Sequence, residues 1–103
     1  MAGGLLIEYD YDGDEDSWRS AIDAFIGSVR ADARLDGCFS YLVVRSKQDP
    51  SHRMHMPRWA DAETLAHVQS QPWFSAFAAQ VKGFAGDSLK TTPLIAEFDS
   101  RDG

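Results

Sequence analysis

The sequence predicts an α+β domain whose elements follow the order β-α-β-β-α-β. Four segments read as strands, and the first of them alternates apolar and polar side chains with a period of two. Two other segments repeat apolar side chains at helical spacing, and turn-forming residues separate the segments. This order is the ferredoxin-like pattern, so we expect an antiparallel sheet that carries helices on one face.

The first strand and the first helix are both marked by periodicity. Residues 5–11 place apolar side chains on one face of a strand. An acidic turn follows, in which Asp14 or Asp16 could cap a helix. A helical stripe then runs to Ala33, and Gly37 fits the left-handed residue that often ends a helix. The members of the stripe are Trp18, Ile22, Phe25, Ile26, Val29 and Ala33.

The next two strands form a predicted hairpin. Residues 39–46 alternate as a strand but carry large apolar groups on both faces. Residues 48–51 contain a short turn, and an antiparallel hairpin is the economical connection to a strand at residues 52–59. Because Pro57 lacks an N–H donor, we expect this third strand to lie at an edge of the sheet or to carry a bulge.

The second helical region is expected in two pieces. Asp61 precedes a helical stretch and is expected to cap it, and Pro72 fits the first turn of a new segment. Gly83 and Gly86 are expected to end that segment, and residues 91–98 form the last predicted strand. The apolar stripe of the second piece consists of Phe74, Phe77, Ala78, Val81 and Phe84.

Size and charge restrict the classes of protein that fit. The chain has 103 residues, close to the commonest domain size, so residues 1–103 are expected to form a single domain. The net charge is −6 and the ten basic residues are scattered, which argues against nucleic acid and anionic membrane as partners. We see no signal peptide or membrane-length apolar run, and Cys38 is a lone cysteine, so a cytoplasmic location is expected.

The predicted sheet would leave one face uncovered. Two helices can cover only one face of a four-stranded sheet. The strand at residues 39–46 is apolar on both faces, so the other face would expose a large apolar patch. Packing against a second copy by two-fold symmetry is the commonest solution. We therefore expect a homodimer.

The segment from Met56 to Phe77 resembles a known family. A strand ends in Trp59, a capped helix carries Leu65 and His67, and after a small break an aromatic pair follows at Phe74 and Phe77. This pattern is similar to that of antibiotic-biosynthesis-monooxygenase-like domains in the dimeric α+β barrel superfamily. Length and element order agree over nearly the whole chain. The resemblance implies the dimeric α+β barrel fold.

The chain departs from that family pattern at several positions. Pro57 stands where many members have glutamate, and Trp73 stands where many have histidine. The haem-degrading branch uses an asparagine on the first strand and a haem-ligating histidine four residues after the helix phenylalanine. This chain has no asparagine, and Ala78 occupies that second position. The haem-degrading chemistry is therefore disfavoured.

The resemblance implies a cofactor-independent monooxygenase that acts on a small, electron-rich aromatic molecule of the quinol or anthrone type. No cofactor and no metal is expected. Such a site needs an apolar pocket, a base, and groups that stabilise developing negative charge. His55 and Trp59 are four residues apart on one strand and project from the same face, which Arg53 shares and Arg58 does not. The candidate catalytic residues are His55, Trp59 and His67, and the candidate substrate-binding residues are Tyr9, Arg53, Trp73 and Phe74.

Plainer interpretations stay open for these residues and for the function. Trp59, Trp73 and Phe74 could be core aromatics, and His67 a structural histidine. His52 and His55 face opposite sides of their strand, so a metal pair is disfavoured. Since one fold hosts several chemistries, an isomerase also stays open. The main alternative is a non-catalytic or stress-related protein that binds a small hydrophobic ligand.

Overall fold

The computed structural model describes residues 2–98 and 100 and has the predicted α+β architecture. Its four strands form one antiparallel sheet in the order β2-β3-β1-β4. Short 3-10 turns follow the first and the last long helix, at Ala33–Leu35 and Gly86–Ser88. The main elements are β1 (Gly3–Asp10), α1 (Glu15–Ala31), β2 (Phe39–Arg45), β3 (His52–Trp59), α2 (Ala62–Gln69), α3 (Pro72–Ala85) and β4 (Lys90–Ile95).

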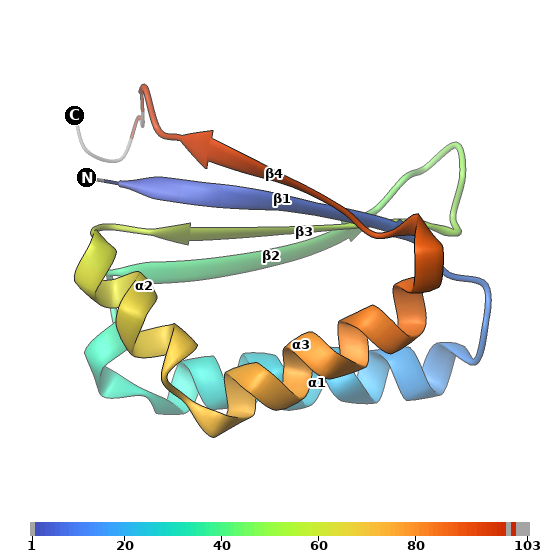
Figure 1. Ribbon diagram of the computed structural model, residues 1–103, viewed down its shortest axis with the longest axis horizontal. Helices are drawn as coiled ribbons and strands as arrows, with labels where there is room; N and C mark the ends of the chain where they lie inside the picture. Colours follow the sequence, from blue (N-terminus) through green and yellow to red (C-terminus); the bar gives the residue numbers. More distant parts are fainter. Residues whose placement is uncertain (1, 99, 101–103) are drawn as a thin grey trace.

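The helices form a single layer against one face of the sheet (Figure 1). All three helices, α1, α2 and α3, lie on the same side, and nothing in the described chain covers the opposite face. Strand register places a set of apolar side chains on that opposite face, which we call the bare sheet face. Its members are Leu6, Leu42, Val44, Met54, Met56 and Leu94.

Side-chain caps and proline fix where the helices begin. Asp14, rather than Asp16, caps α1 by accepting a hydrogen bond from the Ser17 backbone N–H at 3.0 Å. Asp61 caps α2 in the same way, and Pro72 opens α3 as predicted, although α3 runs through Gly83 and ends at Ala85. No helix in residues 2–98 and 100 is long and apolar enough to cross a membrane.

Strand β3 corrects one expectation. It lies between β2 and β1 and so is neither an edge strand nor bulged, despite Pro57. Pro57 pairs with Tyr41 of β2. On the β1 side, pairing is interrupted opposite Pro57 and resumes in the same register, so no residue is inserted. A single missing donor is therefore tolerated inside the sheet because only one ladder is interrupted.

The space between sheet and helices is divided into a filled half and a hollow half. Under α1 and the second half of α3, Phe25 stacks on Phe77 with ring centroids 3.9 Å apart, and Tyr9 and Val81 complete a dry core. Aromatic packing of this kind excludes any ligand from that half. Between the sheet and the α2–α3 corner the side chains do not meet, and a pocket remains.

Candidate functional site

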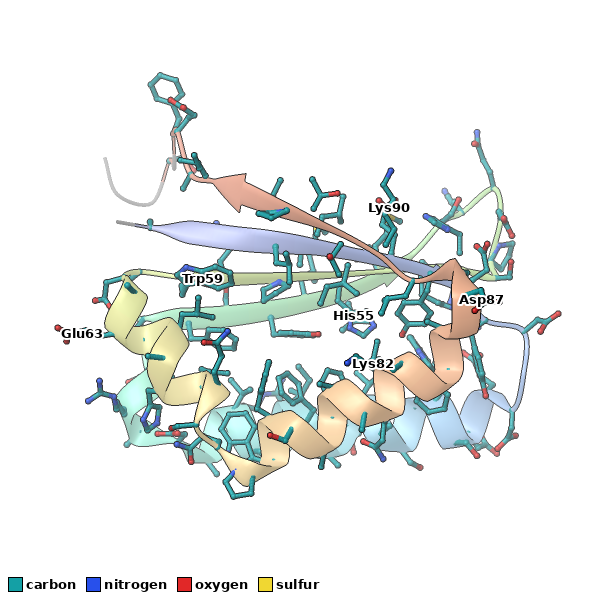
Figure 2. The ribbon with its side chains drawn as sticks, viewed as in Figure 1. His55, Trp59, Glu63, Lys82, Asp87 and Lys90 are labelled. Atoms are coloured by element: carbon teal, nitrogen blue, oxygen red, sulfur yellow. The ribbon has the colours of Figure 1, made fainter. Side chains whose placement is uncertain are left out.

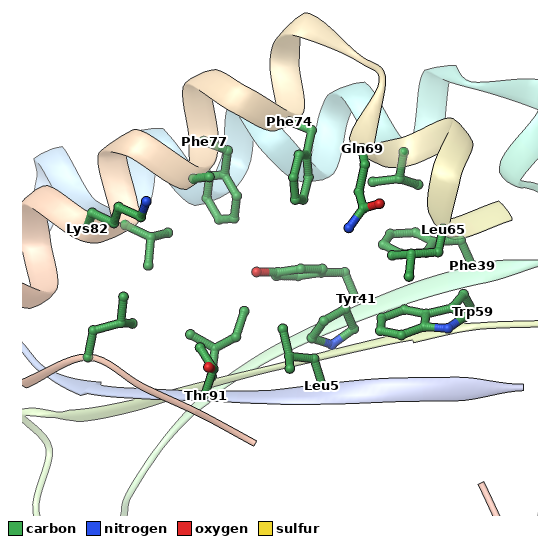
Figure 3. Close-up of a pocket in the computed structure, with 16 residues that line it drawn as sticks. Leu5, Phe39, Tyr41, Trp59, Leu65, Gln69, Phe74, Phe77, Lys82 and Thr91 are labelled. Atoms are coloured by element: carbon green, nitrogen blue, oxygen red, sulfur yellow. The ribbon is translucent and has the colours of Figure 1, made fainter. Parts of the chain in front are cut away.

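The pocket has a volume of about 370 Å³, which lies in the range of small-molecule sites. Its walls are mostly apolar and aromatic side chains from β1, β2, β3, α2 and α3, and β4 contributes Thr91. Figure 3 shows Tyr41 at its centre, with Gln69 and Lys82 reaching over it from opposite ends. The principal walls are Leu5, Ile7, Phe39, Tyr41, Pro57, Trp59, Leu65, Phe74, Phe77 and Leu89.

Two of the predicted site residues, Trp59 and Phe74, line this pocket directly. Trp59 is the last residue of β3, and Figure 2 shows it on the helix side of the sheet together with His55. Gly3 of β1 leaves room for the indole: a Cβ atom at that position would lie 2.9 Å from Trp59 Nε1. The indole can therefore lie against β1 at this position because residue 3 has no side chain.

His55 lies beneath the pocket and reaches it through Tyr41. His55 is fully buried, and its two ring nitrogens bridge two tyrosines. Its Nε2 is 2.7 Å from the Tyr9 hydroxyl, and its Nδ1 is 2.8 Å from the Tyr41 hydroxyl. Trp18 Nε1 donates to the Tyr9 hydroxyl at 2.8 Å. The four side chains form one buried hydrogen-bond chain that ends on a pocket-lining hydroxyl.

Counting donors and acceptors assigns a direction to this chain. Indole N–H can only donate, so Tyr9 accepts from Trp18 and must place its own proton elsewhere. Among the described residues, His55 Nε2 is its one acceptor. The imidazole then carries its proton on Nδ1 and donates it to Tyr41. This leaves the Tyr41 O–H free to donate a hydrogen bond to a ligand in the pocket.

Burial keeps every member of the chain uncharged. Desolvation lowers the pKa of His55 from 6.5 to about 4, so its imidazole is neutral at pH 7. Desolvation also raises the pKa of Tyr41 and that of Tyr9 above the ordinary tyrosine value. The site therefore offers a neutral, fixed hydrogen-bond donor rather than a charged base.

Arg53 lies on the predicted face but is held away from the pocket. Its guanidinium is stacked 4.3 Å from the Trp18 ring centroid. It donates to Glu15 Oε2 at 3.0 Å and to the Tyr11 carbonyl at 3.2 Å. Arg45 also pairs with Glu15, and the two arginines lower the pKa of that carboxyl. Arg53 therefore anchors the start of α1 to β3 in this structure.

His67 and Trp73 also lie apart from the pocket. His67 Nε2 is 2.7 Å from Asp32 Oδ2, which ties α2 to the end of α1 and holds the pKa of Asp32 below its usual range. Trp73 packs edge-on against Phe25, with ring centroids 5.6 Å apart. Of the seven predicted site residues, the structure thus places Trp59 and Phe74 in the pocket walls and places Tyr9 and His55 behind Tyr41.

Three residues that supply polar atoms to the pocket were not predicted from the sequence: Tyr41, Gln69 and Lys82. For Tyr41 a signal existed, because a tyrosine in the apolar face of a strand needs a partner for its hydroxyl. For Gln69 and Lys82 no sequence signal existed, since each sits on an ordinary polar position of a helix. Among residues 2–98 and 100, no group of three or more His, Cys, Asp or Glu side chains could hold a metal ion.

Solved structures with this fold cover nearly the whole chain. Rv0793 from Mycobacterium tuberculosis superimposes with a TM-score of 0.78 at 21% identity, over 97% of this chain and 99% of that one. SnoaB, a cofactor-independent oxygenase from Streptomyces nogalater, gives a TM-score of 0.74 at 11% identity, with 96% of each chain covered. A conserved protein from Methanosarcina mazei Go1 gives a TM-score of 0.77 at 11% identity, with 94% of each chain covered.

Identities this low establish the shared fold alone. No curated protein matches the sequence. Residues 11–80, which include α1, β2, β3, α2 and the first part of α3, match the family described as Antibiotic biosynthesis monooxygenase. Because that match spans more than half of the sequence, the chain belongs to the antibiotic biosynthesis monooxygenase family.

Proposed function

We propose that this protein is a cofactor-independent monooxygenase that oxidises an electron-rich aromatic molecule of the quinol or anthrone type in the pocket between the sheet and the α2–α3 corner. The observation that carries the proposal is the Tyr41 hydroxyl, which lines an aromatic pocket and is fixed from behind by His55. A flat aromatic ring fits between Phe39, Trp59 and Phe74, and its oxygen would accept from Tyr41.

The chemistry needs only the substrate and O₂. Transfer of a proton from the CH₂ group of an anthrone to solvent water gives an enolate, whose oxyanion Tyr41 stabilises by donating a hydrogen bond. The enolate carbon reduces O₂ and forms a C–O bond, which gives a hydroperoxide after protonation. Breaking the O–O bond and the remaining C–H bond releases water and leaves a new carbonyl. One oxygen atom of O₂ enters the product and the other leaves as water.

His55 acts in this scheme through Tyr41. A base with a pKa of about 4 is protonated at pH 7 in roughly one molecule in a thousand, so it is a weak proton acceptor there. Its hydrogen bond instead directs the Tyr41 proton toward the substrate, which favours the ionised form of the substrate. Tyr9 and Trp18 support that orientation from behind.

The alternative is a protein that binds a small hydrophobic ligand without turnover. One observation favours it: no carboxylate or histidine side chain in the described part of the chain lines the pocket, so no strong base contacts the ligand. Binding without oxygen consumption would support this alternative.

Oxygen consumption tests the proposal. A panel of hydroquinones and anthrones is added to the protein and to buffer alone, because anthrones also oxidise spontaneously. We expect uptake above the buffer rate for at least one substrate, and one ¹⁸O atom from ¹⁸O₂ in its product. If several panel members bind and none is consumed faster than in buffer, the oxygenase proposal fails and the ligand-binding alternative is supported.

We also propose that the protein is a homodimer joined through the bare sheet face. Leu42 and Leu94 on that face are 54% and 45% exposed, and four further apolar side chains surround them. A monomer rarely leaves such a patch open to water. A two-fold pairing would bury the patch of each copy against the other.

A further inference from the structure

Among the described residues, the pocket contains one charged side chain in an otherwise neutral lining. That side chain is Lys82 of α3, and no carboxylate in the described part of the chain lines the pocket. Figure 2 places Lys82 between α3 and the sheet, and Figure 3 shows it extending over the pocket from the end opposite Gln69. A lysine on a helix commonly turns its ammonium away into water. Lys82 is exposed, but its side chain also lines the pocket.

Lys82 has no carboxylate partner among the described residues, although the protein is acidic. Three arginines, Arg19, Arg45 and Arg53, each pair with Glu15, whereas no ion pair within residues 2–98 and 100 includes Lys82. The chain carries sixteen acidic and ten basic residues, so this cation beside the pocket stands out against the overall negative charge. An anionic group of a ligand at this end of the pocket would meet a positive charge that no carboxylate among the described residues pairs with.

The donors in the pocket are arranged for a ligand with two acceptor groups. Tyr41 offers a neutral O–H at the centre, directed outward by His55. Lys82 offers N–H groups and a positive charge at one end. An oxygen of the aromatic ring system would lie at Tyr41, and a separate acidic substituent would lie at Lys82.

We propose that the natural ligand of this pocket is an aromatic carboxylic acid whose carboxylate pairs with Lys82. The proposal rests on the proposed function in one respect, that the pocket binds an aromatic molecule. It goes further by fixing the chemical class of the substrate: a polycyclic or quinol ring that carries a carboxylate at one edge, rather than a neutral ring. Lys82 then sets specificity and orientation and takes no part in the oxidation itself.

The test uses ligands that cannot be oxidised further, so that binding is measured apart from turnover. Anthraquinone-2-carboxylate and anthraquinone-2-carboxamide have the same ring system and nearly the same shape and differ in charge. Titration calorimetry of the whole protein under argon gives both dissociation constants. We expect the acid to bind about three- to tenfold more tightly than the amide, and this preference to shrink in high salt.

Variants assign the preference to Lys82. Lys82→Met should remove the preference for the acid and leave binding of the amide within about twofold, because the methionine keeps the apolar stem. Lys82→Arg should keep the preference. The matched control is Lys90→Met, since Lys90 lies on the opposite face of the sheet from Thr91, which lines the pocket.

The outcomes separate this proposal from the one on which it rests. If both probes bind the wild-type protein equally, or if Lys82→Met keeps the preference for the acid, the carboxylate proposal is overturned while the aromatic pocket stands. If neither probe binds, the aromatic pocket itself is overturned and this proposal falls with it. Loss of oxygen consumption alone affects only the monooxygenase proposal.

Discussion

The Tyr41 hydroxyl lies 2.8 Å from Nδ1 of His55, and these two residues join the buried polar chain to the pocket. His55 is on the central strand β3 and Tyr41 on the edge strand β2, so the hydrogen bond crosses one hairpin. Neither side chain carries a charge at pH 7, because burial lowers the pKa of His55 to about 4 and raises that of Tyr41. This hydrogen bond therefore sets the direction in which the Tyr41 O–H points, and it brings no charge to the pocket.

Replacing Tyr41 by phenylalanine should greatly slow turnover while the fold persists. Loss of a single oxyanion donor typically lowers kcat by about 10²- to 10³-fold. His55 Nδ1–H would also lose its partner inside the protein, which costs about 1–3 kcal/mol of the free energy of unfolding. Oxygen uptake and urea denaturation measure the two effects separately.

Ser40→Ala is the control for Tyr41→Phe, since Ser40 is the exposed neighbour on the opposite face of β2. It should leave both measurements unchanged. Full activity in Tyr41→Phe would show that the hydroxyl is not the group that stabilises the oxyanion.

His55 should make the protein less stable in mild acid. Its pKa is about 4 in the folded protein and 6.5 as the ordinary value, so between those limits the unfolded chain binds the proton and the folded one does not. The free energy of unfolding should therefore fall by up to about 3 kcal/mol as the pH drops through this window. His52 acts in the opposite direction, because its hydrogen bonds to Asp10 and Glu8 raise its pKa.

His55→Gln isolates the contribution of His55. Glutamine keeps a donor and an acceptor for the two tyrosines but does not titrate. Urea denaturation of both proteins at several pH values between about 4.5 and 7.5 should show a steeper acid loss in the wild type. Parallel curves would mean that His55 is protonated just as easily in the folded protein as in the unfolded chain.

Much of the fold could be predicted from the sequence, because strands and helix starts depend on residues that are close together in the chain. The turn at residues 48–51 located β3 at residues 52–59 as the second strand of a hairpin, and Asp61 and Pro72 marked the starts of α2 and α3. The position of β3 within the sheet did not follow, since strand order depends on contacts between distant segments. Pro57 predicted an edge strand, but the central strand β3 tolerates the interrupted pairing with β1 at this position.

The candidate site followed only in part for the same reason. Trp59 and His55 were placed on one face by strand alternation, which is local. Tyr41 became significant only through His55, which is fourteen residues away and across a hairpin. Arg53 was a reasonable anion-binding candidate because it shares the strand face of His55 and Trp59. Its guanidinium is instead paired with Glu15, which lies in the first turn of α1. Such pairings arise from tertiary packing and carry no signal in a single sequence.

Glu15→Gln should lower the stability of the fold and have little effect on ligand binding in the pocket. Arg53 is 3% exposed, and removing its carboxylate partner leaves a buried positive charge with weaker compensation. We expect a lower urea midpoint with the ligand dissociation constant little changed. Asp16→Asn, at the next residue of α1, is the control and should leave the midpoint unchanged. Loss of ligand affinity at unchanged stability would instead support a direct role of Arg53 in substrate binding.

Gly3→Ala should weaken ligand binding by displacing Trp59. The added methyl group would lie 2.9 Å from Trp59 Nε1, so the indole must move from its place in the pocket wall. We expect weaker ligand binding by calorimetry and a changed tryptophan fluorescence spectrum. Gly27→Ala is the matched control, because nothing lies within 4 Å of its Cβ position. Alanine in place of glycine inside a helix should raise the free energy of unfolding by about 0.5–1 kcal/mol. Equal ligand affinity in Gly3→Ala and the wild type would exclude a tight fit between Gly3 and Trp59.

A charge on the bare sheet face should separate the proposed dimer. Leu42→Arg places a guanidinium among apolar side chains that a two-fold partner would cover, and an unpaired charge buried there strongly disfavours association. Light scattering should give twice the 11.4 kDa chain mass for the wild type and one chain mass for the variant. Gln80→Arg, on the exposed side of α3, should remain dimeric. A wild-type mass of 11.4 kDa at micromolar concentration would rule the dimer out, and the bare sheet face would then be exposed in the free protein.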